Sequence, residues 1–336
     1  MSRKTMLTEL NPTLSSPERT LAFRDLFSLA GSTWSVSTNA PEILYVFRQL
    51  VQSASFECEP DLSVSIHVNV DSPSLPPWPE PYFRGHDHLV YAAYNEETSF
   101  LIDLLHRRVI ATMSLGMAED LEYWKRVLIP VLLGVASISL QITPLHCACL
   151  VHDGFGLLLG GQSGAGKSTL SLALALEGFA FLSDDWTYFS RSCAEVHAWG
   201  LPTPLKLLPD AVRHFPELHA ATVAPSLNAE LAYEVDPAQM FGVRRTFFCE
   251  PRWLVFVERL ENSSAEFQRI SQADAASRLE VDLETQPAVL ARQREYQLET
   301  IRTLVQRECW LLRHDKDPSS IAHALANFCR NGEFRL

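Results

Sequence analysis

The chain has 336 residues, of which 47% are hydrophobic and 20% are charged, a globular composition with enough length for two domains. Its formal net charge is −12 at pH 7. Such an acidic chain lacks the broad basic field that holds nucleic acid or anionic lipid, so we expect neither a nucleic-acid nor a membrane partner.

The first part of the chain predicts a small α+β domain behind a loose polar arm. Residues 1–20 are polar, and no apolar stretch follows their basic residues, so no signal peptide is expected. Apolar residues have helical spacing over 41–54, and apolar and polar residues alternate over 62–70, which predicts a half-buried strand. The proline-rich segment 71–83 predicts a loop, and short strand-like runs follow at 88–94, 99–105 and 108–115.

A long apolar segment closes this first part. The spacing predicts a helix over 121–140, and its most apolar run, Val127 to Ile142, contains Pro130 and Gly134 and is too short to span a membrane. We therefore interpret it as a buried core segment. The domain boundary is expected near Thr143–Pro144, which gives a domain of unknown role at 1–143 and a second domain at 144–336.

Seven cysteines are scattered along the chain, and only Cys147 and Cys149 lie close together in sequence. A structural zinc site usually shows two paired half-sites, and no second pair exists here. The cysteines are therefore interpreted as reduced, small hydrophobic residues, and the protein as cytoplasmic.

The second part alternates short strands and helices. Residues 145–161 predict two strands joined by a turn at 152–154, and 167–177 predict a helix that Gly178 ends. The run 179–185 predicts a strand that ends in carboxylates. Further on, the pattern predicts a strand at 252–260, a helix at 288–307, a strand at 309–314 and a helix at 319–330.

A glycine-rich loop lies between the predicted strand and helix. Its sequence from Gly161 to Ser168, GQSGAGKS, fits the pattern G-x-x-x-x-G-K-[ST] in full. Glycines allow successive backbone N–H groups to converge on phosphate oxygens, and the following helix adds the positive end of its dipole. The residues expected to hold a nucleotide are Gly161, Ser163, Gly164, Ala165, Gly166, Lys167, Ser168 and Thr169.

Two large nucleotide-binding classes do not fit the rest of the sequence. An ATP-binding-cassette ATPase needs an LSGGQ-like signature downstream, and a GTPase needs an N-K-x-D motif; the chain contains neither. The loop therefore predicts nucleotide phosphate binding by a protein of another class.

Two adjacent carboxylates follow the loop closely, since Asp184 comes 17 positions after Lys167. In a parallel α/β sheet the next strand ends at the same carboxyl edge as the loop, so both Asp184 and Asp185 should lie beside the phosphates. One carboxylate can hold magnesium, and the other can take the proton from an attacking hydroxyl.

These residues together resemble the catalytic domain of HPr kinase/phosphorylase. The resemblance rests on the spacing of His146, His152-Asp153-Gly154, Gly156, the loop, Gly178 and Asp184-Asp185. It implies an α/β fold with a P-loop kinase core that is also similar to ATP-dependent phosphoenolpyruvate carboxykinase. The separate α+β N-terminal domain, predicted from the residues themselves, would precede this core. The implied activity is ATP-dependent phosphorylation of a serine on a protein or peptide.

The resemblance also implies roles for individual residues. Asp184 would be the general base, and His146 would orient or tune it. Lys167 and Ser168 would hold the phosphates of ATP and the magnesium ion, with Asp185 as a second Mg²⁺ contact. A homo-oligomer is compatible with the family, whose C-terminal helix contributes to subunit contacts.

The chain departs from the family downstream of these residues. The signature E-x-R-G-L-G is absent, and the nearest stretch, Glu195 to Pro209, offers only Lys206 as a conjectural positive charge. The sequence therefore leaves open whether the chain has the phosphorylase half of the family's bifunctional activity. Arg244, Arg245 and Arg252 are weaker candidates for contacts with phosphate, since they are equally compatible with surface charges.

The sequence leaves three functions open, of which the first is a kinase for a serine on a protein or peptide. A looser group of HPr-kinase-related kinases includes enzymes that phosphorylate a serine of a ribosomally made precursor peptide, such as a lasso-peptide precursor. The alternatives are an ATP-binding regulator without transfer activity and a kinase for a small molecule such as free serine.

Overall fold

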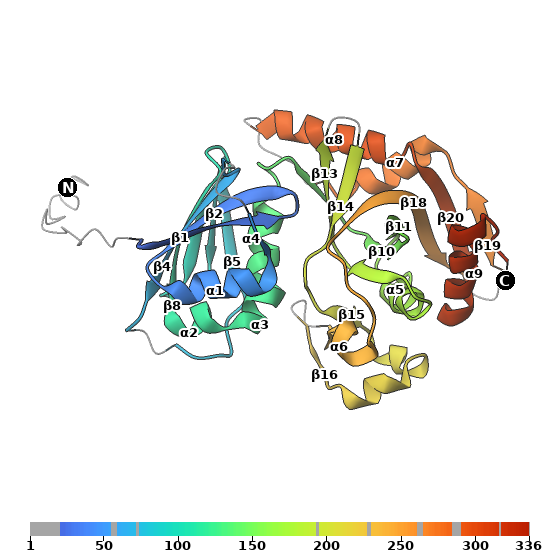
Figure 1. The fold of residues 1–336 in the computed structure, drawn as a ribbon, viewed down its shortest axis with the longest axis horizontal. Helices are drawn as coiled ribbons and strands as arrows, with labels where there is room; N and C mark the ends of the chain where they lie inside the picture. The colour runs from blue at the N-terminus through green and yellow to red at the C-terminus, as the bar shows by residue number, and fades with distance from the viewer. Residues whose placement is uncertain are drawn as a thin grey trace, which may run out of the picture.

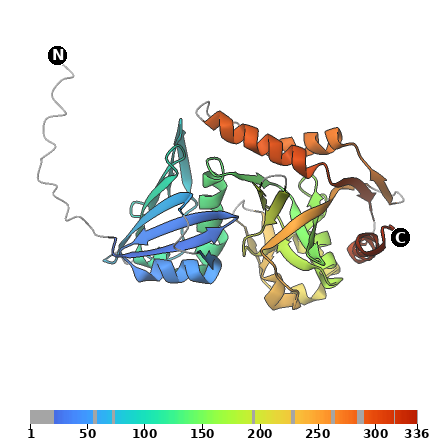
Figure 2. The ribbon, with the colours of Figure 1, turned by 45° about the horizontal axis from the view of Figure 1, so that its top comes forward.

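The computed structural model describes residues 21–54, 59–71, 74–192, 195–226, 230–260, 265–283, 290–315 and 317–335. The predicted polar arm at 1–20 and the first residues of the predicted helix at 288–307 lie outside these described residues. The described chain is a mixed α/β protein in which two large sheets lie side by side, as both Figure 1 and Figure 2 show.

The first sheet has the strand order β3-β1-β2-β4-β8-β7-β6-β5. Strands β2, β4 and β8 run parallel to one another, and the remaining neighbours are antiparallel. The bounds are Phe23–Leu29 (β1), Ser32–Thr38 (β2), Gln52–Ser53 (β3), Leu62–Asn69 (β4), Tyr82–His86 (β5), Leu89–Ala93 (β6), Ser99–Asp103 (β7) and Arg108–Ser114 (β8).

Helices cover one face of this sheet. They are α1 (Pro41–Leu50), α2 (Leu115–Glu119), α3 (Leu121–Tyr123), the π-helical turn η1 (Trp124–Leu128) and α4 (Ile129–Ala136). In β4 the alternation places Val64 and Ile66 in the core with Phe47 and Trp124 from the helices. The predicted burial of the apolar run from Val127 is confirmed, because most of its apolar side chains belong to this core.

The second sheet has the order β12-β10-β11-β18-β14-β13-β9, and β20 pairs with both β18 and β19. The bounds are Ile142–Leu145 (β9), Ala148–His152 (β10), Phe155–Gly160 (β11), Ala180–Ser183 (β12), Thr187–Ser192 (β13), Glu195–Trp199 (β14), Phe248–Arg259 (β18), Glu266–Arg269 (β19) and Glu308–His314 (β20). Strands β11, β18 and β20 are parallel.

The sheet around the loop is not the purely parallel sheet on which the expected position of the aspartates was based. Strand β10 lies between β11 and β12 and is antiparallel to both, so the sheet is mixed. Because two antiparallel steps restore the direction, β12 still runs parallel to β11. The carboxyl ends of both strands therefore meet at the same edge, which is the part of the expectation on which the site depends.

Helices cover both faces of this second sheet. On one face α5 (Lys167–Leu176) packs with α9 (Pro318–Asn331), and on the other lie α7 (Gln272–Glu280) and α8 (Ala291–Leu304). A three-stranded sheet of order β15-β17-β16 joins the core around α5, followed in the chain by a short helix, α6. The bounds of these elements are Leu205–Leu207 (β15), Val223–Pro225 (β16), Leu231–Val235 (β17) and Pro237–Phe241 (α6).

The predicted domain boundary at Thr143–Pro144 falls inside β9, which pairs with β13 of the second sheet. The turn between β1 and β2 reaches across, because a Cβ on Gly31 would lie 2.9 Å from Ser190 Oγ. Two ion pairs also join the parts, Lys125 with Asp236 and Arg126 with Glu234. The division into two domains stays a prediction.

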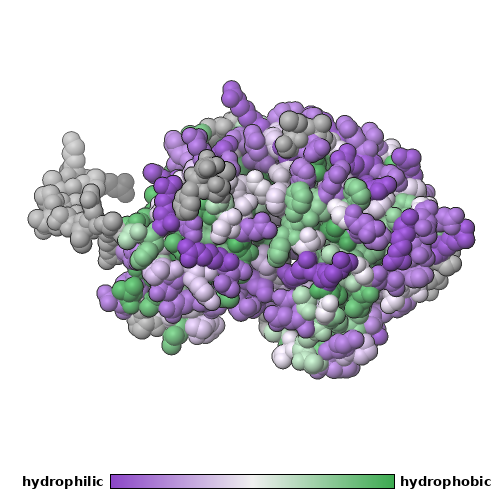
Figure 3. Space-filling view, viewed as in Figure 1, coloured by the Kyte–Doolittle hydropathy of each residue, from purple (hydrophilic) through white to green (hydrophobic). Residues whose placement is uncertain are grey.

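Hydrophilic side chains cover most of the face in Figure 3, with smaller hydrophobic patches between them. Within the described residues, no helix is long and apolar enough to cross a membrane. The five cysteines in the described part of the chain are free, as predicted: Cys147, Cys149, Cys249, Cys309 and Cys329.

Candidate active site

The glycine-rich loop connects the end of β11 to the start of α5. Strand β11 ends at Gly160, and α5 begins at Lys167. Gly161, Gly164 and Gly166 have φ values of 143°, 81° and 93°, a region that side-chain-bearing residues rarely adopt. A Cβ on Gly161 would also lie 2.5 Å from the carbonyl oxygen of Val257. The loop conformation thus depends on glycine, as its sequence predicted.

Lys167 folds back over the loop that precedes it. Its ammonium donates hydrogen bonds to the carbonyl oxygens of Gly161 (2.7 Å) and Gln162 (3.2 Å). Burial lowers the pKa of Lys167, while the charges of Asp185 and Asp184 oppose this shift. The cation is therefore held at the loop and has the two carboxylates within electrostatic range.

Asp184 is a buried carboxylate directly after the end of β12. It is 5% exposed, and its Oδ1 has no hydrogen-bond partner among the described residues. Its Oδ2 accepts a long hydrogen bond (3.4 Å) from the backbone N–H of Lys206. Burial, and then the charge of Asp185, raise the pKa of Asp184 to about 7, whereas the nearby Ser168 hydroxyl, the Lys206 amide and Lys167 act in the opposite direction.

The raised pKa predicts how an Asp184→Asn variant unfolds when magnesium and nucleotide are absent. The folded state retains its proton up to about pH 7, whereas the unfolded chain releases it near 3.8, so wild-type stability falls as pH rises through this window. Above this window the ionised carboxylate lowers the free energy of unfolding of the wild type by up to about 4 kcal/mol, at roughly 1.4 kcal/mol for each pKa unit. Urea denaturation in EDTA should show that the free energy of unfolding of the variant increases relative to that of the wild type as the pH rises from about 4 to 8. A difference that does not change with pH would contradict this prediction.

His146 contacts the second aspartate. Its Nε2 lies 2.8 Å from Oδ1 of Asp185, and its backbone N–H donates to Asp282 Oδ2 at 2.9 Å. The resemblance implied that His146 orients or tunes Asp184, whereas in the structure its side chain contacts Asp185, the next residue in the chain. Burial alone would raise the pKa of Asp185, but the hydrogen bond and charge of His146, with Lys167 and Lys206, bring it below its usual value.

Each residue of the His146–Asp185 pair lines a different cavity. The first, about 510 Å³, is lined by His146, the loop residues Gly160 to Gln162, and the face of α7 that carries Arg278. The second, about 330 Å³, is lined by Asp184 and Asp185 together with Lys206 and several apolar side chains. His146 therefore lines the first cavity beside the start of the loop, and its partner Asp185 lines the second cavity together with Asp184.

The second cavity includes a residue that sequence reasoning missed. Arg126, from η1 in the first part of the chain, lines it beside Pro130 and forms an ion pair with Glu234 of β17. In the sequence Arg126 lies inside an apolar helical pattern almost 60 positions before Asp184. No local signal connects the two residues, because the packing of the two sheets brings them together.

A second missed group lies at the carboxyl edge of β18. Glu258 accepts hydrogen bonds from Arg278 (2.9 Å) and Arg313 (2.9 Å), and both arginines hold its pKa below the usual value. Arg278 also lines the 510 Å³ cavity together with Gly160 to Gln162 at the start of the loop. The sequence pointed to Glu258 only as a strand residue.

The other cations considered from the sequence have different contacts. Arg244 donates to the carbonyl oxygen of Gly178 (2.8 Å), and Arg245 donates to that of Thr203 (2.9 Å). Arg252 lies over the rings of Phe155 and Trp253. The Lys206 ammonium forms an ion pair with Glu230 at 2.7 Å.

The fold and site define a mixed α/β protein with a glycine-rich loop, a buried lysine and two carboxylates at one sheet edge. No protein-family model matches the chain, and no curated protein matches it. Among solved structures, the HPr(Ser) kinase/phosphatase from Coxiella burnetii is similar, at 14% sequence identity and a TM-score of 0.31. The similarity covers 56% of this chain and 98% of that chain, and at this TM-score it carries no argument about function.

Proposed function

We propose that this chain is an ATP-dependent serine kinase that transfers the γ-phosphoryl group of Mg-ATP to a hydroxyl on a protein or peptide. The observation that carries the proposal is Oδ1 of Asp184, a buried oxygen without a partner among the described residues, beside a cavity and next to the loop. A buried polar atom without a partner costs free energy, so its retention favours a functional role.

The donor would lie on the loop and in the 510 Å³ cavity that shares residues with it. The backbone N–H groups at the start of α5 and the ammonium of Lys167 would bind the phosphate oxygens. Lys167 holds two carbonyl oxygens in the present structure, and phosphate oxygens are stronger partners for its charge. Arg278 is placed to contribute a second positive charge.

The oxygen donors at the sheet edge fit a magnesium ion. Mg²⁺ prefers hard oxygen ligands, and the Ser168 hydroxyl and the Asp185 carboxylate supply them. Asp185 has a lowered pKa and remains ionised, and the hydrogen bond from His146 Nε2 fixes its orientation. When bound, the metal would neutralise charge on the phosphate oxygens during transfer.

Asp184 would act as the general base. Its Oδ1 would accept the proton of the acceptor hydroxyl. The hydroxyl oxygen would form a bond to the γ-phosphorus while the bond from this phosphorus to the leaving ADP breaks. A pKa of about 7 suits a group that must take up and release a proton near neutral pH. Asp184 and Asp185 thus divide their roles by environment, one buried and one held ionised.

The phosphotransfer reaction itself is the direct test. The wild-type protein is incubated with γ-labelled ATP, Mg²⁺ and candidate acceptors, namely peptides, small proteins and free serine. Label on a peptide or protein serine supports the proposal, and label on free serine alone supports a small-molecule kinase. Tight ATP binding with no labelled product across the screen would instead indicate a regulator.

The cytoplasmic location, a homo-oligomer and the absence of nucleic-acid partners remain predictions of the sequence.

Arg126 should determine how well the acceptor binds, because its side chain is 41% exposed and lines the 330 Å³ cavity beside the proposed base. We expect Arg126→Ala to raise the acceptor KM roughly tenfold, the loss of one charge-assisted hydrogen bond. The KM for ATP should change little. Steady-state kinetics with each substrate varied in turn would measure both constants.

A matched control for this variant is Arg48→Ala. Arg48 is also exposed and also forms an ion pair, with Asp25 at 2.7 Å, but it lies on α1, and neither cavity is lined by it. Its removal should leave both KM values unchanged. If Arg126→Ala and Arg48→Ala behave alike, Arg126 does not contact the acceptor.

A further inference from the structure

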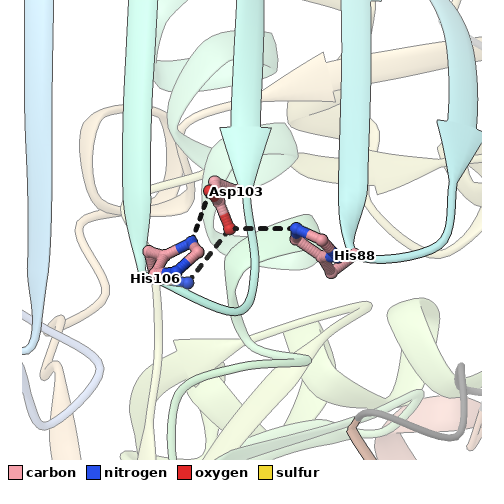
Figure 4. A group of neighbouring side chains, drawn as sticks. All are labelled: His88, Asp103 and His106. Atoms are coloured by element: carbon pink, nitrogen blue, oxygen red, sulfur yellow. Dashed lines mark hydrogen bonds and ion pairs between the residues drawn. The ribbon is translucent and has the colours of Figure 1, made fainter.

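Three side chains converge at one end of the first sheet, away from the loop. His88 lies in the turn between β5 and β6, Asp103 ends β7, and His106 lies in the turn between β7 and β8. Figure 4 shows Asp103 between the two imidazole rings. One ligand atom of each residue lies within 4.8 Å of the other two. Two adjacent turns therefore bring two nitrogen donors and one carboxylate together.

The distances are close to those of a coordination shell. Asp103 Oδ2 lies 2.8 Å from Nδ1 of His106, and Asp103 Oδ1 lies 3.9 Å from Nε2 of His88. Bonds of about 2.0–2.2 Å to a tetrahedral ion place neighbouring ligand atoms roughly 3.3 Å apart. The two separations in the structure lie on either side of this value.

Neighbouring groups orient these side chains for such a role. Nδ1 of His88 lies 3.1 Å from Oδ2 of Asp87, so that nitrogen can donate its proton there and leave the lone pair of Nε2 toward Asp103. Asp103 Oδ1 accepts the backbone N–H groups of Leu105 (3.1 Å) and His106 (3.0 Å), which fixes the carboxylate. A carboxylate behind a ligating imidazole is a common feature of metal sites.

We propose that His88, Asp103 and His106 bind one divalent transition-metal ion, for which Zn²⁺ is the best match. Two imidazole nitrogens and one carboxylate suit a borderline ion better than Mg²⁺ or Ca²⁺, which prefer oxygen ligands. The three residues leave a fourth position for water. The ion would join the β5–β6 turn to the β7–β8 turn. This site is independent of the proposed kinase activity.

Zinc titration of the full-length, untagged chain after treatment with EDTA tests the proposal. We expect calorimetry to show saturable zinc binding by the wild type. The double variant with His88→Ala and His106→Ala should bind one zinc ion fewer per chain. His86→Ala is the matched control, since His86 is an exposed histidine of β5 two positions before His88. It should bind zinc like the wild type. Asp87→Asn should weaken the site roughly tenfold, because it removes the carboxylate behind His88.

Urea denaturation of each metal-free variant separates a lost site from a lost fold; His106 is 69% exposed, so its truncation should be tolerated. Cu²⁺ bound to the wild type should show coupling to imidazole nitrogen in its paramagnetic resonance spectrum, and this coupling should be absent from the double variant. Equal zinc stoichiometry in the wild type and a folded double variant would overturn the proposal, as would an equal loss in His86→Ala. The three residues would then be an ordinary surface ion-pair cluster.

Discussion

Asp184→Asn is expected to lower phosphoryl transfer by roughly 10²- to 10⁴-fold, the range that a positioned general base contributes. The amide cannot accept the hydroxyl proton, but it has nearly the same shape as the carboxylate, so the loop and ATP binding should be retained. The dissociation constant of ATP, measured by calorimetry, should therefore change far less than kcat. Turnover unchanged from the wild type would remove Asp184 from the role of base.

A magnesium titration distinguishes a base from a metal ligand in the same variant. The Ser168 hydroxyl lies near enough to Asp184 to affect its pKa, so Asp184 itself could contact the ion. Loss of a base leaves the Mg²⁺ concentration at half-maximal rate unchanged, whereas loss of a ligand raises it. Asp185→Asn is the partner experiment, and here we expect the magnesium requirement to rise. The opposite pattern in the two variants would exchange their roles.

The loop and its flanking elements could be predicted from the sequence because they depend on neighbouring residues. The spacing of Gly161, Gly164 and Gly166 specifies three positive φ values, and the Leu- and Ala-rich run after them forms α5. The strand ending at Ser183 was predicted for the same reason, since its apolar run is short and ends in carboxylates.

The arrangement around the loop could not be predicted to the same degree, because it depends on long-range packing. Whether β10 is inserted between β11 and β12 is decided by strand pairing, which a local pattern does not specify. His146 contacts Asp185 and not Asp184. Adjacent side chains at a strand end point to opposite faces, so a difference of one residue decides which aspartate faces the histidine. Elements with weak periodicity, such as β15 and β17, were missed as well.

The position of η1, the helical segment that packs on the first sheet, illustrates the same limit. Arg126 and Lys125 are adjacent cations at the edge of a very apolar helix, and both form ion pairs with residues of the β17–α6 region. The proposed role of Arg126 rests on the structure, which places this residue and Pro130 in the lining of the cavity beside Asp184. Two cations beside an apolar helical run are, on sequence alone, equally typical of a solvated helix face.

Lys167→Ala is expected to weaken ATP binding by roughly 10- to 100-fold, because each charge-assisted hydrogen bond to a phosphate contributes about 1.5–3 kcal/mol. Transfer should fall further, by at least about 10²-fold at saturating ATP, since the ammonium also stabilises charge that develops on the transferred group. Loss of the cation also removes an interaction that lowers the pKa of Asp184, so more of the proposed base should be protonated at neutral pH. Calorimetry with ATP and kcat at saturating ATP separate binding from rate.

Arg244→Ala is the matched control for Lys167→Ala, because its guanidinium donates to the carbonyl of Gly178, just beyond the opposite end of α5. It removes one positive charge near the same helix without touching the loop, so a general effect of net charge would appear in both variants. We expect ATP affinity and kcat to remain those of the wild type in Arg244→Ala. ATP affinity unchanged in Lys167→Ala would mean that the loop does not hold the donor phosphates. The proposed kinase mechanism would then fail at its first step, because Asp184 would have no phosphoryl group beside it.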